Sequence, residues 1–303
     1  MRQMNWLWLI AIALILGIGL RIGISAQPTP SETTSASSAE YTHTATQHTS
    51  AALEIPAPRT DGYYPDAESI AVMCDGERNY TFYYDFDTRT PLWVAYTLES
   101  RHMGDYKRPS RWEYNPLLST SDQVNLCYHS YNDGYSRGHL IPNASRDGIS
   151  AMQQQTFYVT NSVPQVQDGF NGGIWQSLER ALQDIGASER IYIVTGVAFE
   201  RMSEERHVAY TTAKDDPSWR VPIPNYFYKV ALKVRYDTTG AIADAQSVGF
   251  WFENRSYKGS YSDYSTSVDN IEAWTGFDFF PNLADDIEHR AEQNTKWHKF
   301  TGF

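Results

Sequence analysis

The sequence has few cysteines and a deficit of positive charge. Its 303 residues contain two cysteines, Cys74 and Cys127, and no Cys-x-x-Cys pair, which excludes a disulfide-dense scaffold and gives no sign of a structural zinc site. Their separation leaves open whether they form a disulfide or remain two buried thiols. Lysine and arginine number 25 against 36 aspartates and glutamates, a formal net charge of −11. Because neutralised phosphates supply most non-specific affinity for nucleic acid, this balance argues against a protein that coats DNA or RNA.

The chain also lacks a long hydrophobic run. Trp6 to Leu20 is apolar and uncharged, but it is shorter than the ~20 residues that usually span a bilayer. With Arg2 before this run and Ala26 at a possible cleavage site, residues 1–26 are typical of a signal peptide. Arg21, between the run and that site, keeps a retained N-terminal anchor as the alternative. Both interpretations predict export, to a secreted or periplasmic location.

A compositional break follows the N-terminal segment. Residues 27–60 are rich in Ser, Thr, Ala and Pro and show no helical or strand periodicity, so they cannot bury enough apolar area to offset the entropy of ordering. We expect a disordered linker there. No second break or repeat follows, and residues 61–303 are predicted to form one domain.

Several short segments have the pattern of strands. Five runs are apolar, aromatic or β-branched: Tyr80–Phe86, Leu92–Leu98, Thr156–Thr160, Ile191–Thr195 and Tyr228–Tyr236. In the last of these, apolar residues alternate with Lys229, Ala231, Lys233 and Arg235. We interpret this largely basic face as a solvated sheet surface.

One segment has the periodicity of a helix. Residues 172–185 carry an apolar stripe at Trp175, Leu178, Leu182 and Ile185, with Gly186 as the expected stop and Asn171 as the expected N-cap. Strands before and after an isolated helix predict an α+β fold.

Three polar motifs follow one another in the middle of the chain. They are Ser136-Arg137-Gly138-His139, then Asn161-Ser-Val-Pro-Gln165, then Asn171-Gly-Gly-Ile-Trp175 with Glu179 beyond it. Taken singly, each is ordinary: a His beside Gly is a common turn residue and an Asn before a helix is a common cap. In this order and spacing, the set resembles the DNA/RNA non-specific endonuclease family, which includes mitochondrial endonuclease G. The resemblance implies a ββα-metal (His-Me finger) fold with a central, mostly antiparallel sheet flanked by helices.

The resemblance also implies roles for individual residues. His139 would be the general base, a role that suits an imidazole with a pKa of about 6.5. Asn171 would hold a divalent metal, Mg²⁺ or alternatively Mn²⁺, since a carboxamide oxygen is a hard donor. Glu179 would hold the water shell of the metal, and Asn161 would orient the loop that carries the histidine.

Arginines complete the expected site, which departs from the family at two positions. Arg108 or Arg111 would contact the phosphate, and Arg137 of the signature is a further catalytic candidate. Ser136 stands where the family usually has Asp, and Gln183 stands where an arginine normally follows the Glu by one helical turn.

The sequence thus predicts an exported, metal-dependent endonuclease that hydrolyses DNA and RNA with little sequence preference. The first alternative is a catalytically inactive nucleic-acid-binding module of the same fold, which the two departures favour. The second is an exported binding or adhesion protein whose Tyr and Trp residues form a ligand surface. DNA and RNA are the expected partners, and nothing in the sequence identifies an inhibitor protein. Against the acidic total, residues 101–111 have a local excess of positive charge: Arg101, Lys107, Arg108 and Arg111 against Asp105 alone. Local phosphate binding on an acidic protein predicts weak binding without metal and strong inhibition by salt.

Overall fold

The computed structural model describes residues 52–303. The predicted signal peptide and the linker as far as residue 51 lie outside the described residues. The predicted linker boundary at residue 60 is too late, because Ala52, Leu53 and Glu54 are buried. Leu53 contributes apolar area to the core, and Glu54 forms an ion pair with Arg78. Within residues 52–303, no helix has the length and hydrophobicity needed to cross a bilayer.

A seven-stranded sheet forms the centre of the fold, in the order β1-β2-β3-β6-β9-β10-β11. Every neighbouring pair in it is antiparallel. A small sheet pairs β4 with β5, and a second pairs β7 with β8. The strand bounds are Ala67–Cys74, Glu77–Asp85, Thr90–Leu98, Ser136–His139, Ser162–Gln165, Ile191–Ala198, Tyr210–Ala213, Asp216–Pro222, Tyr226–Tyr236, Ile242–Glu253 and Ser265–Thr266 for β1 to β11.

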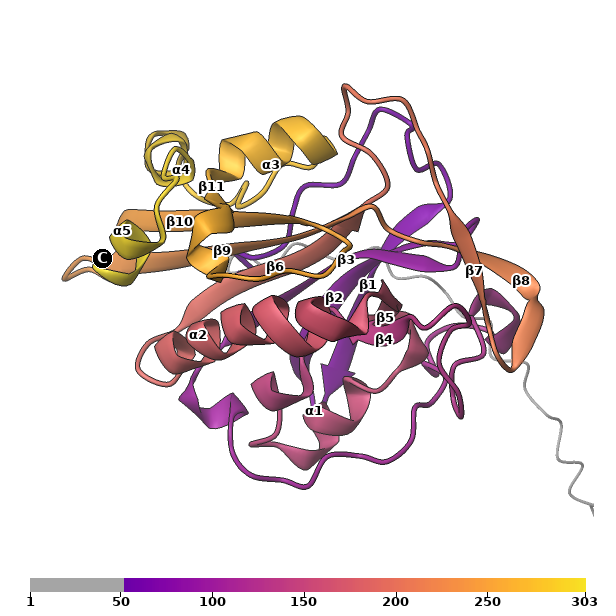
Figure 1. Cartoon of the computed structure of the whole chain (residues 1–303). Helices are drawn as coiled ribbons and strands as arrows, with labels where there is room; N and C mark the ends of the chain where they lie inside the picture. The colour runs from indigo at the N-terminus through magenta and orange to yellow at the C-terminus, as the bar shows by residue number, and fades with distance from the viewer. Residues whose placement is uncertain (1–51) are drawn as a thin grey trace, which may run out of the picture. The chain divides into compact units, whose positions relative to one another are not determined.

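Helices cover both faces of the central sheet (Figure 1). Their bounds are Ser150–Gln155, Gln176–Gly186, Val268–Thr275, Asp285–Glu292 and Trp297–Thr301 for α1 to α5. The face under α2 packs Trp175, Leu178 and Leu182 against alternate sheet residues. The opposite face packs Ile271 of α3 and Ile287 of α4. The predicted α+β class is confirmed.

Four of the five predicted strands are present, as β2, β3, β6 and β9. The strand predicted at Thr156–Thr160 is wrong. These residues leave α1 through a turn and enter the short 3-10 helix η4, Val159–Asn161, before β5 begins. The hydroxyl of Thr156 donates to the carbonyl of Gln153 (2.7 Å), a local bond that ends a helix rather than extending a strand. A short buried apolar run does not distinguish these outcomes.

The basic face of β9 is also different from the prediction. Lys229 and Lys233 are buried at 0% and 1% exposure, while Arg235 is exposed. Lys229 lies beneath α2, where it faces Glu179, and Lys233 pairs with Glu189 (3.0 Å). Alternation in the sequence identified the two faces of the strand, but it could not show that a helix covers the basic one.

The two cysteines do not form a disulfide in this structure. Cys74 is a buried thiol at the end of β1, and Cys127 is a half-buried thiol in the loop before β4. Burial raises the pKa of both thiols.

Candidate active site

A polar cavity of about 620 Å³ lies where β4 meets the start of α2. It contains five of the predicted site residues: Arg108, Arg137, His139, Asn171 and Glu179. Other lining residues include Trp112, Ser136, Asn143, Gln167, Arg180 and Gln183. Residues that are far apart in the sequence therefore meet around one volume large enough for a nucleotide-sized group.

The short strand β4 delivers His139 to this cavity. Its register with β5 pairs His139 with Ser162 and Gly138 with Val163. A Cβ atom on Gly138 would lie 2.4 Å from the side-chain oxygen of Gln165, so the close approach of the two strands requires glycine here. In the Gly-His pair of the motif, Gly138 is thus required for packing, and His139 directly after it lines the cavity.

Two aromatic rings fix the imidazole of His139. The ring centroids of Trp112 and Phe157 lie 4.5 Å and 5.0 Å from that of His139. The imidazole also makes a hydrogen bond with the backbone of Arg137, while its Nε2 atom has no hydrogen-bond partner within residues 52–303. Because the backbone bond favours the charged ring, the imidazole is its donor, and Nε2 is left as the free acceptor.

The surroundings of His139 disfavour its protonated form. Burial, followed by the positive charges of Arg108 and Arg137, lowers its pKa to about 3. The ring is therefore neutral at ordinary pH and able to accept a proton at Nε2. An anion bound near the two arginines would offset their charge and raise the basicity of the imidazole.

Asn171 occupies a different backbone position from the one predicted. It lies inside a wide helical segment, η5, which spans Gln167–Trp175 and departs from helical dihedral angles at Asp168, Gly169 and Gly173. The regular helix α2 begins only afterwards, so Asn171 is not its N-cap. The backbone N–H of Asn171 donates to the carbonyl of Val166 (3.0 Å) and is not free for an anion.

The side-chain amide of Asn171 is oriented by two neighbours. Its Nδ2 atom donates to Ser136 Oγ (3.0 Å) and to Gln167 Oε1 (3.1 Å). Ser136 Oγ in turn donates to the carbonyl of Gln165 (2.9 Å). With both amide hydrogens engaged, the carbonyl oxygen of Asn171 is the atom left to coordinate a cation.

Glu179 faces a buried lysine beneath the cavity. Lys229 Nζ lies 3.7 Å from Glu179 Oε1 and donates to Thr195 Oγ1 (2.7 Å). The ammonium also lies 4.5 Å from the ring centroid of Trp175. Burial raises the pKa of Glu179 and lowers that of Lys229, and the attraction between the two groups opposes both shifts.

The three candidate arginines lie in two different hollows of the surface. The guanidinium of Arg108 lies 5.0 Å from the ring centroid of Phe157 and borders the cavity. Arg137 donates to the carbonyl of Leu126 (2.6 Å) and lies 5.1 Å from the ring centroid of Trp112. Arg111 lines a different hollow, beside Lys107. Of these two arginines, Arg108 is the one that lines the cavity with His139 and Asn171.

Residues 72–286 match the DNA/RNA non-specific endonuclease family. The chain belongs to this family. It is 28% identical to mitochondrial nuclease EXOG of Mus musculus over 214 residues, which cover 68% of this chain and 56% of the relative. It is 24% identical to a nuclease of Nostoc sp. strain PCC 7120, covering 71% of this chain and 76% of the relative. The matched region thus spans only about half of the EXOG length.

A solved structure of an EndoG/EndoGI complex, concerned with the inhibition of EndoG, shares the fold of this endonuclease-family chain. The alignment has a TM-score of 0.60 and 20% sequence identity, and it covers 76% of this chain and 95% of that chain. The same architecture is therefore present despite extensive divergence in sequence.

Ser136 and Gln183, the two positions that depart from the endonuclease-family pattern, both line the cavity. Ser136 acts as the hydrogen-bond acceptor for Asn171, a contact that a carboxylate at the same place would also provide. Gln183 lines the cavity and donates to Ser145 Oγ (3.2 Å). Arg180, on the same helix, also lines the cavity and places positive charge there in the absence of an arginine at 183.

Asn161 lies outside the cavity, behind the loop that follows His139. It is fully buried. Its Oδ1 accepts from the N–H of Ile141 (2.9 Å), and its Nδ2 donates to the carbonyls of Ile141 (2.9 Å) and Thr156 (2.8 Å). Asn161 thus ties the chain after β4 to the turn before β5.

Sequence reasoning missed three residues that support the site: Trp112, Phe157 and Lys229. The aromatic pair had no local signal, because its function depends on contact with a histidine distant in the chain. Lys229 also had no local signal, because alternation places it on the basic face of its strand and does not show that α2 covers this face.

Proposed function

We propose that this protein is a metal-dependent endonuclease that hydrolyses DNA and RNA phosphodiester bonds with little sequence preference. The observation that carries the proposal is the convergence of three groups on one cavity. These are Nε2 of His139, which has no hydrogen-bond partner in the described part of the chain, the amide of Asn171 and the guanidinium of Arg108. The family and the nuclease relatives support the same reaction class.

The residues present suit a hard divalent cation, and we propose Mg²⁺. The carbonyl oxygen of Asn171 is directed by the hydrogen bonds of its own amide group, and Glu179 adds a carboxylate to the same cavity. Mg²⁺ prefers oxygen ligands and retains several waters, so a single protein ligand is chemically reasonable. When bound, the ion would supply positive charge that stabilises the leaving oxygen.

His139 would act on the attacking water. Its Nε2 atom is unprotonated, because burial and two arginines keep the ring neutral. The aromatic contacts of Trp112 and Phe157 restrict the ring to one orientation. Such a ring can accept the proton of a water as that water attacks phosphorus.

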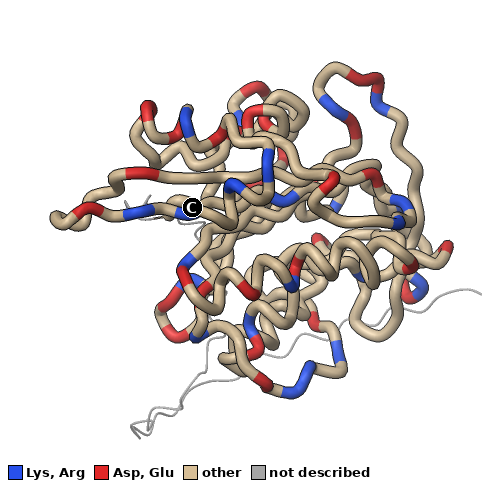
Figure 2. The backbone as a smooth tube through the Cα atoms, turned by 60° about the vertical axis from the view of Figure 1, so that its left-hand side comes forward, with Lys and Arg blue, Asp and Glu red and all other residues tan. Residues whose placement is uncertain are grey.

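The positively charged side chains would hold the substrate by its phosphate. Arg108 and Arg180 line the cavity, and a guanidinium can bind two phosphate oxygens at once. Elsewhere, acidic and basic residues are interspersed along the backbone (Figure 2). Since phosphate contacts carry no sequence information, such a site would cut many sequences.

A cleavage assay with supercoiled plasmid and with structured RNA tests the proposal. We expect nicking in Mg²⁺, none in excess chelator, and loss of at least ~100-fold of the rate in His139→Ala. Tyr135→Phe, a conservative change of a cavity-lining residue outside the proposed machinery, is the matched control and should cut normally. Metal-dependent cutting that His139→Ala leaves unchanged would refute this mechanism. Binding of nucleic acid without any cleavage would instead establish the inactive module.

A pair of arginine variants tests the assignment of phosphate contact. Arg108→Ala removes a charge from the cavity, whereas Arg111→Ala removes the same charge from the neighbouring hollow. We expect Arg108→Ala to raise KM and to lower kcat/KM, with a much smaller effect of Arg111→Ala. Equal effects of the two substitutions on kcat/KM would show that neither arginine makes a specific phosphate contact. Both would then act only through the electrostatic potential of the protein surface.

We also propose that the protein is exported. The proposal rests on the apolar N-terminal run and its flanking charge. Sequencing the N-terminus of the protein recovered outside the cytoplasm tests it, and a chain that remains in the cytoplasm would contradict it.

A further inference from the structure

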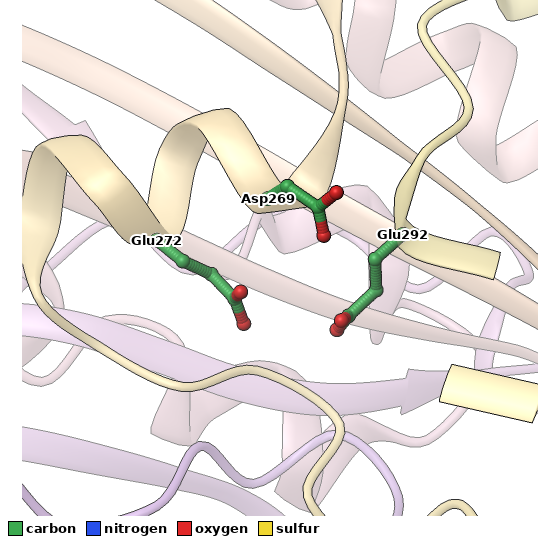
Figure 3. A group of neighbouring side chains, drawn as sticks. All are labelled: Asp269, Glu272 and Glu292. Carbon is green, nitrogen blue, oxygen red and sulfur yellow. The ribbon is translucent and has the colours of Figure 1, made fainter. Parts of the chain in front are cut away.

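Three carboxylates converge on the face of the sheet opposite α2. Asp269 and Glu272 come from α3, and Glu292 ends α4. One carboxylate oxygen from each lies within 4.8 Å of the others, and Figure 3 shows the three side chains directed toward a common space. This acidic cluster is formed by segments that do not contribute to the catalytic cavity.

Glu292 is the most deeply buried residue of the three. It is 6% exposed, and its Oε1 atom is buried without a hydrogen-bond partner among the described residues. The side chain points toward Asp269 and Glu272 (Figure 3). A buried carboxylate oxygen costs free energy when it has neither a donor nor a cation, so this orientation indicates a missing partner.

No basic side chain of the described region compensates Glu292. The groups that act on its pKa are burial and the acidic residues Glu272, Glu288, Asp269 and Asp278, and all of them raise it. Its position at the C-terminal end of α4 adds the negative end of the helix dipole. Glu272 has one favourable contact, a hydrogen bond from the N–H of Phe279 to Oε1 (2.7 Å).

We propose that Asp269, Glu272 and Glu292 bind a calcium ion that joins α3 to α4. The donor set consists of carboxylate oxygens alone, which suits a hard cation and not the softer transition metals. Ca²⁺ has ligand distances of ~2.3–2.6 Å, so oxygens on opposite sides of the ion stand up to about 5 Å apart. The three oxygens, all within 4.8 Å of one another, lie inside this range. A site of three carboxylates suits Ca²⁺, whereas Mg²⁺ usually keeps several waters and binds only one or two carboxylates.

The ion would stabilise the helices that cover one face of the sheet. Both α3 and α4 pack on β10, and Ser247 Oγ of that strand donates to the carbonyl of Ala291 (2.8 Å), next to Glu292. Neutralising the cluster removes repulsion between the two helices, and ligand that binds only the folded state raises the melting temperature. This role goes beyond the proposed nuclease reaction and does not depend on it.

Calorimetric titration with Ca²⁺ tests the proposal. The protein is the full chain carrying Asn171→Ala, stripped of metal with a chelator, so that the proposed catalytic metal ligand is absent. We expect a single saturable calcium site and a Tm that rises with Ca²⁺ concentration. Absence of both would mean that the carboxyls are held by shared protons, and the proposal would be wrong. Equal affinity for Mg²⁺ would overturn the assignment to calcium.

Isosteric variants locate the site. Glu292→Gln and Glu272→Gln, added separately to the same protein, should each abolish the calcium heat and the calcium-dependent rise in Tm. Each should also raise the Tm measured without metal, because it removes repulsion, and this readout shows that the variant folds. Asp285→Asn, an exposed change of the same charge on α4, is the matched control and should retain binding. Calcium binding that persists in both Gln variants would place the ion elsewhere and refute the proposal.

Discussion

The buried histidine predicts a specific dependence of stability on pH. In the folded protein the pKa of His139 is lowered to about 3, whereas in the unfolded chain it is about 6.5. As pH falls below 6.5, the unfolded state binds a proton that the folded state refuses, so stability decreases. Between pH 8 and pH 5 this single group costs about 2 kcal/mol of unfolding free energy.

The substitution His139→Asn removes this contribution. Urea unfolding followed by tryptophan fluorescence, at pH 8 and pH 5 without divalent metal or substrate, should show that the wild type loses about 2 kcal/mol more than the variant. The buried His102, whose pKa is lowered to about 4, is present in both proteins and cancels. Gln176→Ala should follow the wild type at both pH values. An equal loss in wild type and His139→Asn would refute the inference that the imidazole is held neutral.

Three further substitutions test the supports of the site. Lys229→Met leaves Glu179 buried without its partner, and it should lower the unfolding free energy by about 3 kcal/mol; the double variant with Glu179→Gln should regain most of this loss. Ser136→Ala removes the acceptor that orients Asn171, so the Mg²⁺ concentration for half-maximal cleavage should rise about tenfold, whereas Ser136→Thr should not change it. Gly138→Ala brings a Cβ against β5 and should destabilise the fold by about 1–3 kcal/mol, with an unchanged Tm contradicting the packing argument.

Some elements of the fold follow from local pattern alone. The period-two alternation of β9 and the apolar runs of β2, β3 and β6 identified strands, because half-buried or fully buried sheet positions require such residues. The apolar stripe identified the buried side of α2, with Leu178 and Leu182 in the core together with Trp175 just before the helix. The predicted start of this helix, with Asn171 as N-cap, is wrong, because α2 begins at Gln176. Hydrophobic periodicity does not reveal the wide turn around Asn171 or the break at Gly173.

The candidate site was predictable in its members but not in its geometry. The order of the three motifs pointed to His139, Asn171 and Glu179, and the structure places them around one cavity. The choice between Arg108 and Arg111 was not predictable, because neighbouring arginines in a loop can face different hollows.

The sequence by itself therefore determined four strands of the central sheet, the amphipathic helix and the residue types available for catalysis. These depend on local periodicity and on side-chain chemistry. Only the tertiary structure decided the neutral state of His139, the burial of Lys229 and the convergence of Glu292 with α3. Each of these depends on desolvation and on charges contributed by distant segments, and such effects exist only when the chain has folded.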